Sequence, residues 1–173
     1  LAREILDLKA ANGWTHLDLT CLPAKLHLYP EKITQAVIDT VTLHREKYDE
    51  FFVVYADCGT GGLLDAACQK LGVQMIAGPH CYSFFEGNDR FSATSETEIT
   101  TFYLTDFLVR QFNSFIIKPM GLYFGNYEKL VYQAQTDDPD LTEKAKACAA
   151  TLGLTFERRF TGYGDLENAL KTL

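Results

Sequence analysis

The residues best suited to chemistry in this sequence are thiols and imidazoles placed after predicted strands: His27, Cys58, His80 and Cys81. His27, Cys58 and the His80-Cys81 pair each follow a different predicted strand. Loops at the carboxyl ends of neighbouring parallel strands share one edge of a sheet, so the fold would bring these side chains together. Zinc takes about four thiolate or imidazole donors that converge in space. We therefore expect a zinc site formed by these four residues, although their spacing is not that of a zinc finger.

An alternative interpretation treats the cysteines as part of the core, because a free cysteine often behaves as a small apolar side chain. This alternative stays open for Cys58 and Cys81. Cys68 and Cys148 lie on the apolar faces of predicted helices, and we expect both to be buried. Five widely spaced cysteines in a chain of this size do not indicate a disulfide scaffold, so we expect free thiols and a cytoplasmic location.

A glycine-rich turn surrounds Cys58, with the sequence Asp57-Cys58-Gly59-Thr60-Gly61-Gly62. A strand that enters such a turn before a helix is similar to the first motif of S-adenosylmethionine-dependent methyltransferases. Here Asp57 replaces the first glycine of that motif, and Tyr55 stands in place of its acidic residue. The next predicted strand also lacks the terminal carboxylate that would hold a ribose. We predict that the turn binds no S-adenosylmethionine and that its glycines adopt positive φ.

The pattern of apolar residues predicts an α/β fold, a single Rossmann-like domain over residues 1–173 with three layers and a mainly parallel sheet. Strands are expected at 15–19, 51–56, 73–77, 129–133 and 154–160. Helices are expected at 1–12, 30–48, 63–71, 102–115, 141–152 and 165–173. The polar stretch 86–101 is predicted to be a mobile loop. The carboxyl ends of the strands then carry the candidate ligands.

Composition limits the classes of partner. The chain has 16 Lys and Arg against 23 Asp and Glu, a formal net charge of −7. This charge disfavours binding to nucleic acid or to anionic lipid, so we expect a small-molecule substrate and neither a nucleic-acid nor a membrane partner. No signal-peptide pattern begins the sequence, which opens within a helical pattern. We expect further residues, including a strand, before residue 1.

Six short motifs occur in an order that resembles domain-of-unknown-function family 1638 of bacteria and archaea. They are Ala2-Arg3-Glu4-Ile5, Leu26-His27-x-x-Pro30-Glu31-Lys32-Ile33, Tyr55-Ala56-x-Cys58-Gly59, His80-Cys81 followed by Gly87, Phe102-Tyr103-Leu104-Thr105, and Tyr127-x-Lys129-Leu130-Val131. Together they extend over almost the whole chain. The resemblance implies a metal site at His27, Cys58 and Cys81, and a cysteine-containing loop before residue 1. In many members an aspartate stands where His80 stands here.

The same resemblance implies a metabolic setting but no established reaction. Genes of the family often lie near corrinoid-dependent methyltransferase genes, which implies a role in one-carbon or methylamine metabolism and a corrinoid protein or methyltransferase as partner. Three functions follow as hypotheses. The protein is an enzyme or methyl-transfer accessory with a thiolate-rich zinc site, a small-molecule binding protein whose metal is structural, or an S-adenosylmethionine-dependent methyltransferase.

Overall fold

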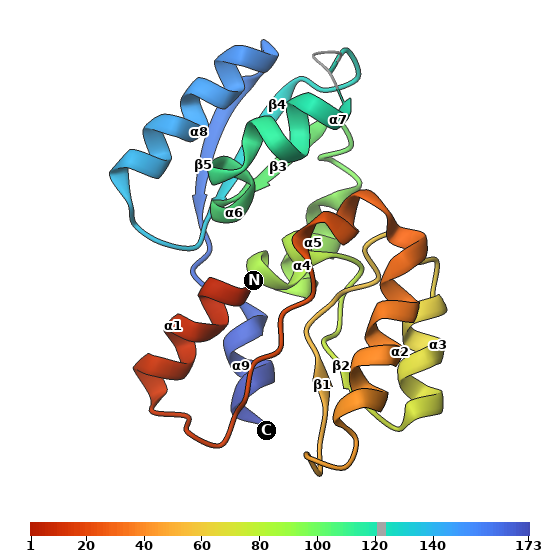
Figure 1. The fold of residues 1–173 in the computed structure, drawn as a ribbon. Coiled ribbons are helices and arrows are strands. Elements are labelled where there is room, and N and C mark those ends of the chain that lie inside the picture. The colour runs from red at the N-terminus through yellow and green to blue at the C-terminus, as the bar shows by residue number, and fades with distance from the viewer. Residues whose placement is uncertain (121–123) are drawn as a thin grey trace. The chain divides into compact units, whose positions relative to one another are not determined.

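The computed structural model describes residues 1–120 and 124–173, which divide into two compact units, Leu1–Cys81 and Tyr82–Leu173. Figure 1 shows helices and strands alternating along the chain in each unit. All pairs of described strands are parallel, which confirms the predicted Rossmann-like α/β class. The strands form two separate sheets, β1-β2 and β3-β4-β5, so the prediction of one sheet is wrong. The single domain over residues 1–173 stays a prediction.

The first unit has a two-stranded sheet packed against two helices. Its elements are α1 (Ala2–Asn12), η1 (Ala24–Leu28), η2 (Pro30–Lys32), α2 (Ile33–His44), β1 (Phe52–Val53), α3 (Leu63–Leu71) and β2 (Gln74–Met75). Helices α2 and α3 lie side by side next to the strands in Figure 1. They bury one apolar cluster: Leu26, Ile33, Val37, Val41, Leu64, Cys68 and Val73. Burial of Cys68 in this cluster confirms its predicted structural role.

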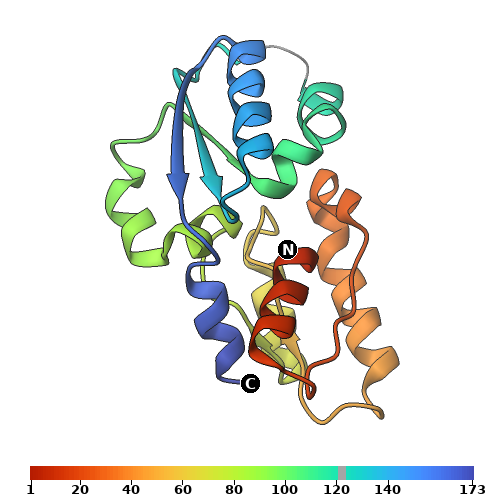
Figure 2. The same ribbon diagram turned by 90° about the vertical axis from the view of Figure 1, so that its left-hand side faces the viewer.

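The second unit has a longer sheet with helices on both faces. Its elements are α4 (Cys81–Glu86), α5 (Asn88–Ser95), β3 (Thr101–Thr105), α6 (Asp106–Arg110), the π-helical turn η3 (Asn113–Ile117), α7 (Lys118–Met120), β4 (Lys129–Ala134), α8 (Pro139–Leu152), β5 (Thr155–Phe160) and α9 (Asp165–Lys171). In Figure 2, α8 lies on one side of the strands and the α4–α5 segment on the other. This unit is therefore an arrangement of three layers.

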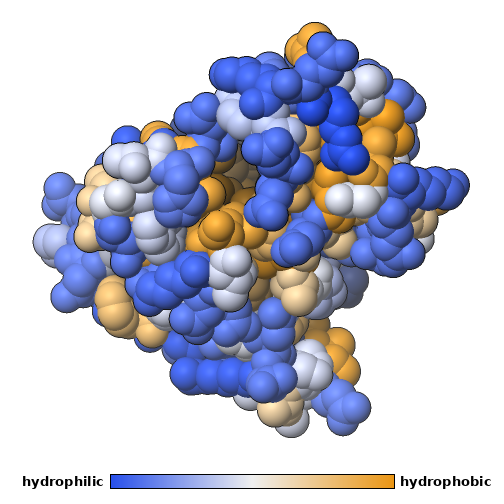
Figure 3. Space-filling model, turned by 90° about the horizontal axis from the view of Figure 1, so that it is seen from below, coloured by the Kyte–Doolittle hydropathy of each residue, from blue (hydrophilic) through white to orange (hydrophobic). Residues whose placement is uncertain are grey.

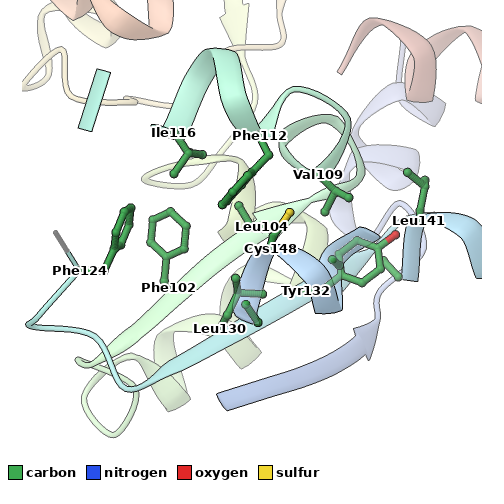
Figure 4. Packing of buried hydrophobic residues seen from close by; sticks show 13 residues of the cluster. Phe102, Leu104, Val109, Phe112, Ile116, Phe124, Leu130, Tyr132, Leu141 and Cys148 are labelled. Atoms are coloured by element: carbon green, nitrogen blue, oxygen red, sulfur yellow. The ribbon is translucent and has the colours of Figure 1, made fainter. Parts of the chain in front are cut away.

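Alternation along the strands of the second unit divides its core. Leu104 and Leu130 face α6 and α8, as Figure 4 shows, while Tyr103 and Val131 face the opposite layer with Phe91 of α5. The sulfur of Cys148 lies in the cluster that contains Leu104 and Leu130 (Figure 4), which confirms that this cysteine is a core residue. Transfer of such apolar area out of water is the main favourable contribution to folding.

Several predicted elements need correction. Residues 15–19 form no strand, and strand β3 occupies the start of the segment predicted as the helix 102–115. All five residues of β3 are buried, so the strand carries no polar face that would distinguish it from a helix by periodicity. The segment 86–101, predicted to be a mobile loop, contains the two-turn helix α5.

Within the described parts of the chain, no helix is long and apolar enough to cross a lipid bilayer. Some apolar side chains are nevertheless exposed. The face in Figure 3 is mostly hydrophilic, with several orange groups, some of them clustered. The large exposed ones are Leu6, Leu28, Tyr29, Leu43, Leu63, Ile99 and Phe160. Scattered residues of this kind are normal on protein surfaces.

Candidate functional site

The two predicted thiol ligands lie on adjacent loops of the first unit. Strands β1 and β2 are parallel neighbours, with Val53 opposite Met75, so their exit loops leave the same edge of the sheet. The amide of Cys58 donates a 3.1 Å hydrogen bond to the carbonyl of Pro79 and thereby joins the loops. The backbone amide of Cys81 in turn hydrogen-bonds to the Cys58 thiol. The structure therefore brings Cys58 to the backbone of Cys81, as the strand order predicts.

The surroundings of the Cys58 thiol shift its pKa in opposite directions. Burial raises its pKa above the ordinary value, and the charge of Asp57 acts in the same direction. The amides of Cys81 and Ala56 lower the pKa, because they stabilise the thiolate by hydrogen bonding. A thiol in this environment stays protonated without a cation, and a bound metal would displace the proton.

The glycine-rich turn around Cys58 closes on its own carboxylate. Asp57 accepts hydrogen bonds from the Thr60 hydroxyl at 2.6 Å and from the amides of Gly62 and Gly61 at 2.8 and 3.2 Å. These bonds also lower the pKa of Asp57. An amide that already donates to Asp57 is not free to receive a phosphate or carboxylate from a ligand. The absence of S-adenosylmethionine stays a prediction, but this arrangement gives it a physical reason.

Backbone geometry at the turn confirms the predicted positive φ. Gly59, Gly61 and Gly62 have φ of 86°, 63° and 82°. Cys58 itself has φ of 46°, the only positive value of a non-glycine residue in the described parts of the chain. Such a conformation costs a residue with a Cβ roughly 1 kcal/mol or more, and it is common at functional sites. The turn therefore holds the Cys58 side chain in a direction that an unstrained backbone would not give.

His27 is positioned by the short helix η1 and by an aromatic neighbour. Its Nδ1 lies 3.1 Å from the Ala24 carbonyl oxygen and 3.3 Å from the Tyr55 hydroxyl. The imidazole stacks on the Tyr55 ring, with centroids 5.0 Å apart and planes inclined by 23°. Although the side chain keeps considerable solvent exposure, desolvation by neighbouring groups lowers the pKa of His27 below 6.5. The ring is therefore neutral near pH 7, which is the form that binds metals.

The segment that carries His27 continues toward the turn. A Cβ added to Gly59 would lie 3.6 Å from the ring carbons of Pro30, which begins η2. His80 is half-buried beside Cys81, and burial lowers the pKa of its imidazole. Among residues 1–120 and 124–173, however, no three His, Cys, Asp or Glu side chains lie close enough to hold a metal ion together. The ligand set stays a prediction that requires side-chain movement.

Tyr55 is a site residue that the sequence reasoning missed. Burial, with the charges of Cys58 and Cys81 acting in the same direction, raises the pKa of its phenol to about 12. The phenol therefore lies within electrostatic reach of both thiols as well as against His27. Its only sequence signal is its place three residues before Cys58, at the end of an apolar run.

A separate polar cluster lies on the α4–α5 side of the sheet in the second unit. Arg159 of β5 forms ion pairs of 2.7 Å with Glu86 and Glu98, and Lys129 pairs with Glu98 at 3.1 Å. Tyr103 donates a hydrogen bond to Glu98 as well. These charges largely satisfy one another, which is the pattern of a structural network rather than of an open binding site.

The sequence model of the family "Protein of unknown function (DUF1638)" matches residues 21–170. The chain belongs to this family. No curated protein and no solved structure matches the chain. The DUF1638 match includes His27, Cys58, His80 and Cys81 and extends over both compact units, which confirms the resemblance seen in the motifs. Because the family description names no reaction, the chemistry has to be argued from the site.

Proposed function

We propose that the first unit binds zinc through the thiolates of Cys58 and Cys81 and the imidazole of His27, with His80 as an adjacent donor. The observation that carries this proposal is the contact between the Cys58 thiol and the Cys81 amide, across the exit loops of two neighbouring parallel strands. Two thiols and an imidazole are donors that favour zinc over harder cations such as magnesium.

The environment of these donors fits a zinc ion. The His27 Nδ1 is directed at the Ala24 carbonyl, as in metal sites where a histidine gives its second nitrogen to a backbone acceptor. The Cys58 sulfur receives two backbone amides, and such amides stabilise thiolates bound to metals. The proposal requires these donors to draw closer together when the metal binds, because no three of them in the described residues lie close enough to hold an ion. A structural site closed by four protein ligands and a site with an open position both begin from these donors.

In the proposed reaction, bound zinc would lower the pKa of a thiol or water at its open position and so provide a nucleophile at neutral pH. Cys58 is held in place by its strained backbone and by the amides of Ala56 and Cys81. Tyr55 and the residues of η1 limit access of water to one side of His27. A substrate thiol bound there would lose its proton and accept a methyl group from the methylated corrinoid of a partner, whose cobalt would keep the electron pair of the broken cobalt–carbon bond. This chemistry supports a role in corrinoid-linked one-carbon metabolism, with a corrinoid protein or methyltransferase as partner.

Elemental analysis of protein purified under anaerobic conditions tests the proposal. We expect about one zinc ion per chain in the wild type and loss of that ion in Cys58→Ser and Cys81→Ser. Cys21→Ser is the matched control, because Cys21 is an exposed cysteine of the same unit, outside the site. Circular dichroism checks that each variant stays folded. Full zinc content in folded Cys58→Ser, or no zinc in the wild type after reconstitution, would contradict the proposal.

Cobalt substitution separates a catalytic from a structural metal. With an open coordination position, addition of a small thiol changes the visible spectrum of the bound cobalt, whereas a site closed by four protein ligands does not respond. A closed site would favour the alternative of a small-molecule binding protein. Calorimetry with S-adenosylmethionine tests the remaining alternative, and micromolar binding would favour a methyltransferase.

A further inference from the structure

The arrangement of Tyr55, His27 and Ala24 determines which nitrogen of His27 can bind a metal. The Ala24 carbonyl oxygen lies 3.1 Å from Nδ1. A carbonyl oxygen can only accept a hydrogen bond, so the favourable tautomer carries its proton on Nδ1. The lone pair then resides on Nε2, which is the atom available to a cation.

The Tyr55 side chain supports this arrangement in two ways. Its ring stacks on the imidazole and limits rotation of His27 about its side-chain bonds. Its hydroxyl oxygen, 3.3 Å from Nδ1, can accept the same N–H as the Ala24 carbonyl.

We infer that Tyr55 is the positioning residue of this site: it holds His27 with Nε2 available to the metal. The expected effect on metal affinity rests on the proposed zinc function. The contacts of Tyr55 and Ala24 with His27 exist in the metal-free protein. Hydrogen bonds from outside the ligand set orient metal ligands and strengthen metal binding by about 10- to 100-fold. Tyr55 would supply such support to the imidazole of His27.

Two substitutions separate the contributions of the hydroxyl and the ring. Tyr55→Phe keeps the stack and removes the hydroxyl, so we expect zinc affinity to fall about 10-fold. Tyr55→Leu removes the stack as well, so we expect a fall of about 100-fold and a mixture of the two His27 tautomers. Tyr29→Phe is the control, since Tyr29 is an exposed tyrosine between η1 and η2. Zinc affinity is measured by competition with a chromophoric chelator.

Nitrogen-15 NMR of the imidazoles in metal-free protein provides a readout that a merely structural role would not produce. We expect His27 of the wild type as the Nδ1–H tautomer. The opposite tautomer in the wild type, or unchanged zinc affinity in both folded Tyr55 variants, would overturn the inference. A wild type that binds no zinc would refute the proposed function instead. The NMR comparison of wild type with Tyr55→Phe and Tyr55→Leu would still decide whether Tyr55 positions His27.

Discussion

The two units of this chain use the ends of parallel strands in different ways. In the second unit β3 is followed directly by Asp106, whose buried carboxylate accepts hydrogen bonds from Tyr132, Gln135 and Thr136. In the first unit β1 leads to Cys58, where the polar bonds of the turn are made by Asp57 and the thiol extends toward a second loop. The polar groups after β3 and β4 hydrogen-bond to one another, whereas the loops after β1 and β2 carry thiol and imidazole side chains.

The strands of the second unit are also longer than those of the first. Strands β3, β4 and β5 contain five or six residues each, whereas β1 and β2 contain two. Longer strands present more paired backbone and more apolar side chains to the helices on each face. The comparison suggests a division between the units: the second has the more regular structure, whereas the first replaces regular structure with the loops that hold the candidate ligands.

The largest effect is expected from the core of the second unit. Leu104 is fully buried between β4 and the helices, so Leu104→Ala should lower the free energy of unfolding by about 3 kcal/mol. Urea denaturation measures this change. Ile99→Ala is the control, because 78% of the Ile99 surface is exposed and the change should cost at most about 0.5 kcal/mol. Zinc per folded chain should not change, and a parallel loss of zinc affinity would break the division.

The ion-pair cluster should give the next effect. Arg159→Met leaves the fully buried Glu86 without its closest cation, and we expect a loss of roughly 2–3 kcal/mol at pH 7. Arg159, by its hydrogen bonds, is also the main cause that lowers the pKa of Glu98 from 4.5 to about 2. A lowered folded-state pKa contributes stability above the unfolded value, and this stability is lost as pH falls from about 5 toward 2. The difference between wild type and Arg159→Met should therefore shrink over that range.

Urea denaturation at pH 7, 5, 4 and 3 follows this convergence. Glu98→Gln should flatten the pH dependence in the same range, because the substituted side chain does not ionise. Glu143→Gln is the matched control, since Glu143 forms an exposed pair with Lys146 at the surface of α8. If the curves of wild type and Arg159→Met stayed parallel down to pH 3, the network would not have the stabilising role assigned to it.

The sequence was a good guide to elements whose signals are local. Helix α1 ends at Gly13 in the left-handed conformation, and α8 begins with the sequence Asp138-Pro139, in which the aspartate caps the helix. Strands β4 and β5 agree with the predicted 129–133 and 154–160 almost residue for residue. These elements combine apolar patterning with a clear beginning and end, so little beyond local physics is needed to predict them.

Elements that depend on distant partners were predicted less well. The run Thr101–Thr105 is buried on both faces because α5 packs on one side and α6 with α8 on the other, and no single stretch of sequence contains that information. Helix α5 was missed because the surrounding segment is polar, although Glu86 and Glu98 at its two sides pair with Arg159 far along the chain. Division of the strands into two sheets is likewise a property of long-range pairing.

In the candidate site, too, the features set by strand order could be predicted, whereas contacts between residues far apart in the sequence could not. Adjacency of Cys58 and Cys81 followed from strand order, because parallel neighbours share an edge. The role of Tyr55 was not visible, since it depends on where η1 places the His27 ring. The sequence also does not predict that Asp57 closes the turn through hydrogen bonds, because there this residue stands out only as a departure from a cofactor motif.

A smaller effect is expected at the turn itself. Asp57→Ala removes the acceptor for the Thr60 hydroxyl and for two glycine amides, but water can replace part of these bonds at the surface. We expect a loss of about 1–2 kcal/mol in unfolding free energy, together with weaker zinc binding because Cys58 is less firmly held. Asp65→Ala is the control, since Asp65 is an exposed residue at the start of α3. Loss of zinc in that control would show that the effect is not specific to the turn.

The smallest effect on stability tests the division most directly. Cys58 has a positive φ of 46°, which a glycine adopts without strain, so Cys58→Gly should lie within about 0.5 kcal/mol of the wild type in unfolding free energy. Both variants lose the thiol, but Cys58→Ala keeps the backbone strain and should be the less stable of the two. Both should lose zinc. Gly59→Ala, at φ of 86°, should instead cost about 1 kcal/mol. If Cys58→Gly were less stable than Cys58→Ala, the backbone at Cys58 would not be strained. The position of the thiol would then cost the first unit no stability.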